Sequence, residues 1–438
     1  MPLHLATLAR ERVVFFDCAT GTTLQALGLA AGERPETWNI RRPDVLVGFH
    51  RQCLEAGAEL LKINTFGANS PHFPPGGAFA LKDLIFAAVA NAKTAIRQTG
   101  REGSAWAACG LGPTGKLLAP YGDLAFEDAV AIFREAAAYG AAAGADLILV
   151  ETMSDTLEAK AAVLGAKEGA PALPLAVTMS FAENGRLLTG GTPAAAVTMM
   201  EALGAQAFGV NCGAGPERAL RVLPEILRLA HIPVIANPNA GLPRLEGDRS
   251  YFDMTPADFA QQCEVIFDLG AALQGGCCGT TPAHIAALTM RLRGRKPVPP
   301  QGKDEITLCS ARKTLVLGSE PAKIAAFSAA AVEEALQSGI GEDICDEAME
   351  LEGDGAELLA LQTPAGADPQ SAAALVEQLQ GASQLPLCFD FAGGGYAALE
   401  AMLRRCNGVP LVRCKSREDR QAVQTLAAQY GAVVEAAP

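Results

Sequence analysis

Two adjacent cysteines, Cys277 and Cys278, lie between glycines in the stretch "LQGGCCGTTPAHI" (273–285). An adjacent pair forms a disulfide only with strained geometry, so metal binding is the first candidate. A third thiol, Cys212, stands in "GVNCG" (209–213) at the end of a predicted strand. Zn²⁺ binds thiolate sulfur at about 2.3 Å, prefers four tetrahedral ligands and keeps one position open where it is catalytic. These three cysteines are therefore the predicted zinc ligands and, through zinc, the predicted catalytic residues.

A zinc site of this kind favours a sulfur substrate. The metal holds a thiol as thiolate at neutral pH, which supplies a nucleophile without a general base. Three anionic ligands keep the bound sulfur electron-rich, so alkylation of a thiol is the expected reaction. A structural zinc site more often uses two CxxC pairs, and the chain contains no CxxC. Hydrolytic zinc enzymes normally use His and carboxylate ligands, and none of the five histidines lies in an HExxH pattern.

A repeated sequence pattern predicts strands that alternate with helices. A Gly-Ala pair, a polar residue and a short apolar run recur in "AGAELLKINTF" (56–66), "AGADLILVETM" (143–153), "LGAQAFGVNCG" (203–213) and "DGAELLALQTP" (354–364). A C-cap glycine followed by a strand buried on both faces has this signature. The strands expected in the first part of the chain lie at 13–16, 60–65, 105–111, 146–151, 173–181, 205–211, 232–237 and 272–276. These strand–helix units predict an α/β fold, a (β/α)8 TIM barrel, with a doubly wound open sheet as the alternative.

The polar residues that end these strands form a second group of candidates. In a TIM barrel the loops after the strands converge on one mouth, where chemistry collects. The strand-end residues are Asp17, Asn64, Glu151, Cys212, Asn237 and the Cys277–Cys278 pair. A carboxylate such as Glu151 at the end of an apolar strand is costly without a partner, which favours a functional role. A helix N-cap is the alternative role for Asp17, and loop shaping is the alternative for Asn64 and Asn69.

A second, smaller domain is predicted after the barrel. The segment "RLRGRKPVPPQGKDE" (291–305) is rich in proline, glycine and basic residues, as linkers often are. We therefore predict a barrel over 1–295, a linker over 296–311 and a partial βα domain over 312–438. The strands expected in this last region lie at 313–319, 356–362, 385–391, 409–415 and 431–436. The region amounts to roughly half a barrel. The sequence leaves open whether it closes alone, pairs with a second copy as a homo-oligomer or rests on the first domain.

Composition argues against several classes of partner. The 35 basic and 48 acidic residues give a net charge of -13, which repels nucleic acid and anionic membrane surfaces. The N-terminus lacks the features of a signal peptide, and no apolar run reaches the roughly 18 residues that span a bilayer. We therefore expect a cytoplasmic protein, in which the cysteines are thiols or metal ligands. The cysteines expected to be core thiols are Cys18, Cys53, Cys109, Cys263, Cys309, Cys345, Cys388, Cys406 and Cys414.

Six segments together resemble the zinc-dependent homocysteine S-methyltransferase family, which includes the homocysteine-binding module of cobalamin-dependent methionine synthase. The segments are "DCATGTTLQALG" (17–28), "GAELLKINTFGAN" (57–69), "DLILVETMSD" (146–155), "FGVNCG" (208–213), "VIANPNAG" (234–241) and "GGCCGTTPAHI" (275–285). The resemblance covers 10–295 and implies a (β/α)8 barrel in which the three cysteines hold zinc and homocysteine sulfur becomes the fourth ligand.

The resemblance also implies roles for the other strand-end residues. Asp17 and Glu151 would lie near the ammonium group of the substrate, and Asn237 would contact substrate or take the open position on the metal. With Asn64 they form the predicted substrate-binding set. One departure from the family is Cys18, which stands where glycine is usual; its side chain would narrow the pocket or simply pack.

The function implied is transfer of a methyl group to the thiol of L-homocysteine to form methionine. The donor is open between a methyl-corrinoid protein and a small sulfonium or ammonium compound such as S-methylmethionine, S-adenosylmethionine or a betaine. Two alternatives remain: a corrinoid-system methyltransferase that acts on a different thiol or methyl donor, and a zinc-binding scaffold without catalysis. The chain contains no cobalamin-binding DxHxxG segment.

The region after the linker is similar, more loosely, to the first half of the pterin-binding barrel that follows the homocysteine module in methionine synthase. "DEAMELEGDGAELLALQT" (346–363) and "LPLCFDF" (385–391) match its early βα units. The opening "GERINPTG"-like motif of that barrel is replaced by "GSEPAKIAA" (318–326), and Asp390 is the one pterin-site carboxylate that the comparison retains. A degenerate half-barrel is therefore expected.

Overall fold

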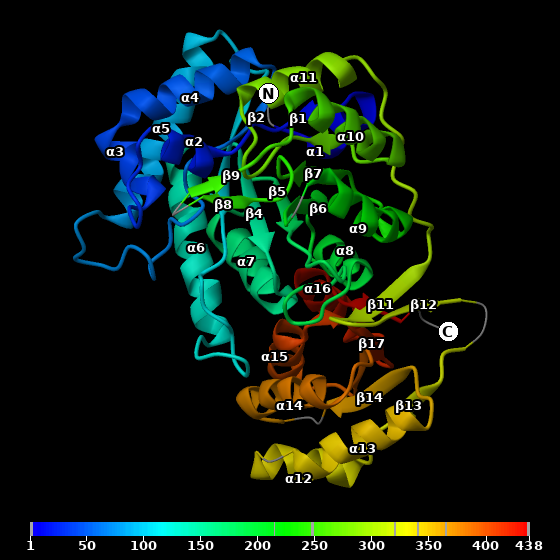
Figure 1. The fold of residues 1–438 in the computed structure, drawn as a ribbon. Coiled ribbons are helices and arrows are strands. Elements are labelled where there is room, and N and C mark those ends of the chain that lie inside the picture. Colours follow the sequence, from blue (N-terminus) through cyan, green and yellow to red (C-terminus); the bar gives the residue numbers. More distant parts are fainter. Residues whose placement is uncertain are drawn as a thin grey trace. The chain divides into compact units, whose positions relative to one another are not determined.

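The computed structural model describes residues 3–213, 215–246, 249–318, 321–339, 341–363 and 366–435 (Figure 1). The chain divides into two compact units. The first comprises Met1–Thr189 and Ala205–Gln301, and the second comprises Gly190–Gly204 and Gly302–Pro438. Among the described residues, no helix combines the length and the apolar character needed to cross a bilayer.

The first unit is built on an eight-stranded parallel sheet in the order β1-β10-β7-β6-β5-β4-β3-β2. Phe16 and Leu60 form a parallel bridge, and the backbone N–H of Asp17 donates to the Leu60 carbonyl, so the first and last strands also meet. This closure confirms the predicted (β/α)8 TIM barrel. The strands are β1 (Val14–Phe15), β2 (Leu60–Lys62), β3 (Trp106–Leu111), β4 (Leu147–Met153), β5 (Leu175–Met179), β6 (Ala207–Cys212), β7 (Val234–Pro238) and β10 (Leu273–Gln274).

Helices connect the consecutive strands of the barrel. The β1–β2 connection holds α2 (Thr20–Ala26), η1 (Pro35–Thr37), α3 (Trp38–Arg41) and α4 (Pro43–Glu55). The later connections hold α5 (Leu81–Gln98), α6 (Phe126–Ala143), α7 (Thr156–Gly169), α8 (Pro193–Ala202), α9 (Pro216–Leu229) and α10 (Pro256–Leu269), and α11 (Pro282–Leu292) follows β10. A short antiparallel hairpin, β8 (Arg244–Glu246) with β9 (Arg249–Tyr251), precedes α10 and was not predicted.

The interior of the barrel is a packed apolar core, as the strand sequences predict. Residues near the beginning of the strands, such as Leu60 and Leu147, are fully buried in one cluster. The N-terminal helix α1 (Leu5–Glu11) contributes Leu5 and Ala9 to the same cluster, so it covers the amino-terminal end of the barrel. The opposite end, where the strands finish, is thereby left for polar side chains.

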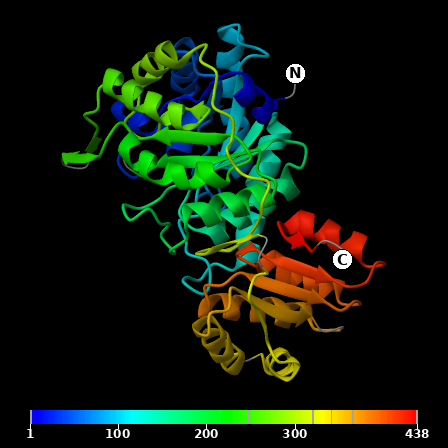
Figure 2. The same ribbon diagram turned by 90° about the vertical axis from the view of Figure 1, so that its right-hand side faces the viewer.

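The second unit contains a five-stranded parallel sheet whose strands lie side by side in sequence order (Figure 2). The strands are β13 (Ile324–Ala326), β14 (Leu358–Thr363), β15 (Leu387–Phe391), β17 (Leu411–Cys414) and β18 (Val433–Val434). Its helices are α12 (Ala329–Ser338), α13 (Glu342–Gly353), α14 (Pro369–Ala382), α15 (Tyr396–Arg405) and α16 (Arg420–Tyr430). A separate antiparallel sheet is formed by β12 (Thr314–Leu317), β11 (Ile306–Ser310) and β16 (Gly408–Val409).

The structure differs from the sequence expectation at the start of this unit. The segment 313–319 was expected to open the parallel sheet, but its strand β12 pairs antiparallel with β11, and β13 opens the parallel sheet instead. Residues 306–310, within the expected linker, form β11 because Leu308 and Cys309 are buried there. In addition, α8 groups with this unit, where it packs against β11 and β16.

Candidate metal centre and substrate pocket

The sulfur atoms of Cys212, Cys277 and Cys278 all lie within 4.8 Å of one another. Cys212 ends β6 and the other two follow β10, so the cluster forms where two strands finish on either side of β7. Among the described residues it is the one group of three or more His, Cys, Asp or Glu side chains close enough to share a metal ion. Tetrahedral zinc with Zn–S bonds of about 2.3 Å places its sulfur ligands about 3.8 Å apart, a spacing that this cluster fits.

The backbone next to the cluster is held in an unusual conformation. Thr152 and Cys212 have positive φ angles of 63° and 59°, in the left-handed region that residues other than glycine rarely adopt. Asn211 connects the two positions, because its Nδ2 donates to Thr152 Oγ1 at 2.6 Å and its Oδ1 accepts from the Thr152 backbone N–H at 3.1 Å. Backbone strain of this kind persists only where neighbouring contacts hold it, typically at functional sites.

The charges of the three thiols depend on one another. Hydrogen bonds from the Cys277 and Cys278 thiols lower the pKa of Cys212 to about 3, although burial opposes this effect. The pKa of Cys277 is raised by its hydrogen bonds to the other two sulfurs and by burial, and donation to Cys212 raises the pKa of Cys278 to about 11. Three close sulfurs thus favour a single negative charge among them. A divalent cation removes this restriction because it stabilises all three thiolates.

A cavity of about 370 Å³ opens beside the sulfur cluster. It is lined by the ends of several strands and by the loops that follow them, including Lys62, Asn64, Glu151 and Thr152 together with the three cysteines. Its volume lies in the range of small-molecule sites, and its walls carry both charged and apolar groups.

Glu151, the last polar group before the strained Thr152, is 6% exposed and lines this cavity. Burial raises the pKa of its carboxyl group to about 7; Lys62 lowers the pKa, whereas Asp17 and Cys212 raise it further. Gly110 makes room for the carboxylate, since a Cβ atom at that position would lie 2.2 Å from Glu151 Oε1. No hydrogen bond reaches this carboxylate from the part of the chain that the structure describes. It is therefore available to a cationic ligand.

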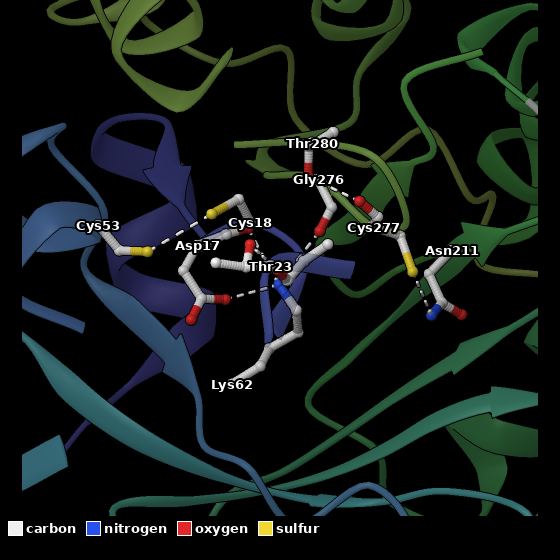
Figure 3. A network of polar contacts seen from close by, with 10 residues as sticks. Asp17, Cys18, Thr23, Cys53, Lys62, Asn211, Gly276, Cys277 and Thr280 are labelled. Carbon is white, nitrogen blue, oxygen red and sulfur yellow. Dashed lines mark hydrogen bonds and ion pairs between the residues drawn. The ribbon is translucent and has the colours of Figure 1, made fainter. Parts of the chain in front are cut away.

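Asp17 does not line the cavity; it is fully buried and paired with Lys62. The ammonium Nζ of Lys62 lies 2.6 Å from Asp17 Oδ1 (Figure 3). Helix α2 begins at Thr20 and its N-cap is Ala19, so the alternative N-cap role for Asp17 does not apply. Lys62 was not among the predicted site residues. A charged residue in the apolar strand "LLKINT" (60–65) was the signal that could have found it, by the argument that selected Glu151.

The two predicted asparagines lie in different surroundings. Asn64 lines the cavity, and its Nδ2 donates to the Pro35 carbonyl at 2.7 Å and to Asn39 Oδ1 at 2.8 Å, so both amide hydrogens hold the loop that carries η1. Asn237 is buried on β7 opposite Asn211 and does not line the cavity. Its Oδ1 accepts no hydrogen bond from the described residues.

Cys18, the residue that departs from the family pattern, is fully buried with its sulfur 3.5 Å from Cys53 Sγ. Its side chain therefore packs against Cys53 and does not line the cavity. Asn211 and Thr152, which hold the strained strand ends, were not predicted to have a role. The Asn-Cys pair in "GVNCG" (209–213) was the available signal, but the partner of Asn211 is 59 residues away and cannot be identified from local pattern.

Comparison with known protein families places the chain in a class of methyltransferases. The family model described as homocysteine S-methyltransferase matches residues 14–292, so the chain belongs to this family and the resemblance seen in the sequence is confirmed.

Individual relatives agree with this assignment. The chain is 35% identical over 294 residues to a methionine synthase of Mycobacterium tuberculosis, and the aligned region covers 64% of this chain and 25% of the relative. It is 33% identical over 320 residues to a methionine synthase of Mycobacterium leprae, and the aligned region covers 69% of this chain and 26% of the relative. The chain thus spans about a quarter of the length of these curated relatives.

Solved structures show the same barrel. The homocysteine methyltransferase MmuM from Escherichia coli, in its oxidized form, is 25% identical with a TM-score of 0.54, covering 65% of this chain and 98% of MmuM. The metallated form of MmuM has a TM-score of 0.55 at 24% identity, with the same coverage of both chains.

Proposed function

We propose that this chain transfers a methyl group to the thiol of L-homocysteine to form methionine, with zinc held by Cys212, Cys277 and Cys278. The observation that carries the proposal is the meeting of three sulfurs from two strand ends at one side of a cavity that also holds the buried carboxylate of Glu151. Bound zinc would supply the Lewis acidity that keeps a substrate thiol deprotonated at neutral pH.

The protein's own residues orient the amino acid. Glu151 faces the cavity with no partner among the described residues, and the ammonium group of homocysteine is the cation we assign to it. Asn64 offers its remaining amide oxygen to the same cavity, since both of its amide hydrogens are engaged. Asp17 acts indirectly, because Lys62 occupies its carboxylate. Asn237 lies behind the cavity and supports the site from β7.

We further propose that the methyl donor is presented by a second protein, a methyl-corrinoid protein acting in trans. Large apolar side chains are exposed on the connections that follow the barrel strands, at the face where the cavity opens; they are Leu27, Phe66, Leu117, Tyr121, Leu188 and Leu242. Leu188 is 70% exposed and Leu242 is 62% exposed. Phe66 also lines the cavity, and an apolar group exposed at the mouth of a site favours a macromolecular partner.

We interpret residues 312–438 as a degenerate half of a pterin-binding-like barrel. The parallel strands of the second unit are ordered as in the sequence, which is the arrangement of a barrel segment rather than of a doubly wound sheet. Asp390 on β15 is engaged by the Arg413 guanidinium on β17, with contacts of 2.5 and 2.6 Å to its two oxygens. We propose that this carboxylate stabilises the sheet and does not bind a pterin.

Metal analysis and a donor assay test the proposal. The wild type should carry about one zinc ion per chain and Cys278→Ala far less. Cys263→Ala is the matched control, since it removes a buried thiol from α10 and should leave the zinc content unchanged. The proteins are then incubated with homocysteine and either a methyl-corrinoid protein or S-methylmethionine, S-adenosylmethionine or betaine.

Methionine formed with the corrinoid protein and lost in Cys278→Ala supports both parts of the proposal. Product from a small donor alone would replace the corrinoid partner and retain the homocysteine reaction. Zinc in the wild type without product from any donor would contradict catalysis and favour a scaffold.

A further inference from the structure

Lys62 is a buried cation beside the sulfur cluster, and its contacts extend beyond Asp17. Its side chain is 10% exposed, and it ends β2. In addition to Asp17 Oδ1 at 2.6 Å, its Nζ donates to the Asp17 carbonyl at 3.0 Å and to the Gly276 carbonyl at 3.2 Å (Figure 3). An ammonium group has three hydrogens, so these three oxygens use all of its donors.

The three acceptors belong to two different strand ends. Asp17 follows β1, and Gly276 follows β10 and immediately precedes Cys277. The backbone N–H of Gly276 also donates to the Asp17 carbonyl at 3.1 Å, so the two segments are bonded directly as well as through Lys62. Gly276 cannot carry a side chain here, because a Cβ atom would lie 2.3 Å from Thr280 Oγ1.

The same turn is fixed on its other side. Thr280 Oγ1 donates to the Cys277 carbonyl at 2.7 Å, and the Cys277 N–H donates to the Pro238 carbonyl at 2.8 Å. The peptide groups on both sides of Cys277 therefore have defined partners, and Lys62 is the one charged partner in this set.

The charge of Lys62 suits this place. Burial alone lowers the pKa of the ammonium group, but Asp17, Glu151 and Cys277 together raise it above its usual value. Lys62 is therefore a cation at neutral pH, beside the acidic groups of the site. It also occupies Asp17, whereas Glu151 has no such partner and stays open to the substrate.

We propose that Lys62 is a positioning residue for the metal centre: its ammonium group joins the end of β1 to the Gly276 carbonyl and thereby holds Cys277 where its sulfur meets those of Cys212 and Cys278. This inference rests on the zinc-dependent function proposed above. Groups that orient metal ligands in this way typically contribute 10–100-fold to metal affinity, roughly the effect expected here.

The test compares zinc affinity between variants that keep the charge balance of the interior. Lys62→Met alone leaves Asp17 as an unpaired buried charge and should fold poorly. The double variant Asp17→Asn/Lys62→Met removes both charges. Zinc affinity is measured by competition with a chromophoric chelator, and the Co²⁺-substituted protein gives thiolate-to-cobalt absorption bands that report the ligand geometry. Fluorescence of the buried Trp38 and Trp106 checks the fold of the barrel.

A matched control is available in the same barrel. Lys93 and Asp146 form a more exposed ion pair between α5 and the residue that precedes β4, at the end of the strand opposite to the site. The double variant Lys93→Met/Asp146→Asn should keep the zinc affinity and cobalt spectrum of the wild type.

The double variant at Asp17 and Lys62 should bind zinc about 10–100-fold more weakly, with altered cobalt bands. Lys62→Arg keeps the charge but spreads its donors over a planar fork. It should also lose zinc affinity, which gives a second measurement if the double variant does not fold. Wild-type affinity in either variant would overturn the role of Lys62 and leave the proposed function intact. A wild-type protein that binds no zinc would overturn both.

Discussion

Glu151→Gln should stabilise the free protein while it weakens homocysteine binding. Burial raises the pKa of Glu151 from 4.5 to about 7, so the folded protein holds a proton on this group that the unfolded chain releases between those pH values. The contribution of this carboxyl group to the free energy of unfolding is therefore fully present below pH 4.5 and is lost as the pH rises through about 7. At about 1.4 kcal/mol per pKa unit, the charged carboxylate costs the folded state about 3 kcal/mol at pH 8. Glutamine removes that cost.

The prediction is tested by urea unfolding of both proteins over a range of pH. Both tryptophans, Trp38 and Trp106, lie in the first unit, so their fluorescence reports the unfolding of the barrel alone. The variant should exceed the wild type by about 3 kcal/mol at pH 8, with the difference shrinking as the pH falls. Calorimetry should show homocysteine binding weakened by about 30-fold or more, because the ammonium group loses its partner. A variant that is less stable at pH 8, or a difference that does not change with pH, would refute the reasoning.

Three further substitutions separate the site from the scaffold. Gly110→Ala places a methyl group 2.2 Å from Glu151 Oε1, so the carboxylate must move. KM for homocysteine should rise about tenfold or more, with little loss of stability. Gly209→Ala is the contrast, because its Cβ would lie 1.9 Å from a backbone oxygen of β7 and should destabilise the barrel in the same unfolding assay. Asn211→Ala removes the partner of the Thr152 N–H, which should lower the free energy of unfolding by about 1–3 kcal/mol. The variant should also bind zinc more weakly in the chelator competition. Unchanged values would show that Asn211 is not needed to maintain the positive φ angles at Thr152 and Cys212.

Much of the barrel and the identity of its thiols could be predicted from the sequence. The predicted strand 146–151 corresponds to β4, and the predicted strand 205–211 corresponds to β6, because a glycine before a run of buried residues is a local signal. The strands at the start of the second unit were harder to predict from the sequence. Both 313–319 and 324–326 are short and apolar, and the choice between parallel and antiparallel pairing depends on which strand is adjacent after folding.

The candidate site shows the same division. Its thiols and Glu151 stand out in the sequence because each is a reactive or charged group in an apolar or glycine-rich setting. The hydrogen bond of Lys62 to Asp17 spans 45 residues and its hydrogen bond to Gly276 spans 214, so neither contact can be predicted from the local sequence.

The sequence by itself therefore determined which residues could do chemistry and that a parallel barrel would carry them, since both follow from residue type and short-range spacing. Only the tertiary structure decided that Asp17 is occupied by Lys62 while Glu151 stays open to the cavity. That choice depends on closing the barrel, which sets the ends of β1, β2 and β10 beside one another and so determines which buried charges neutralise each other.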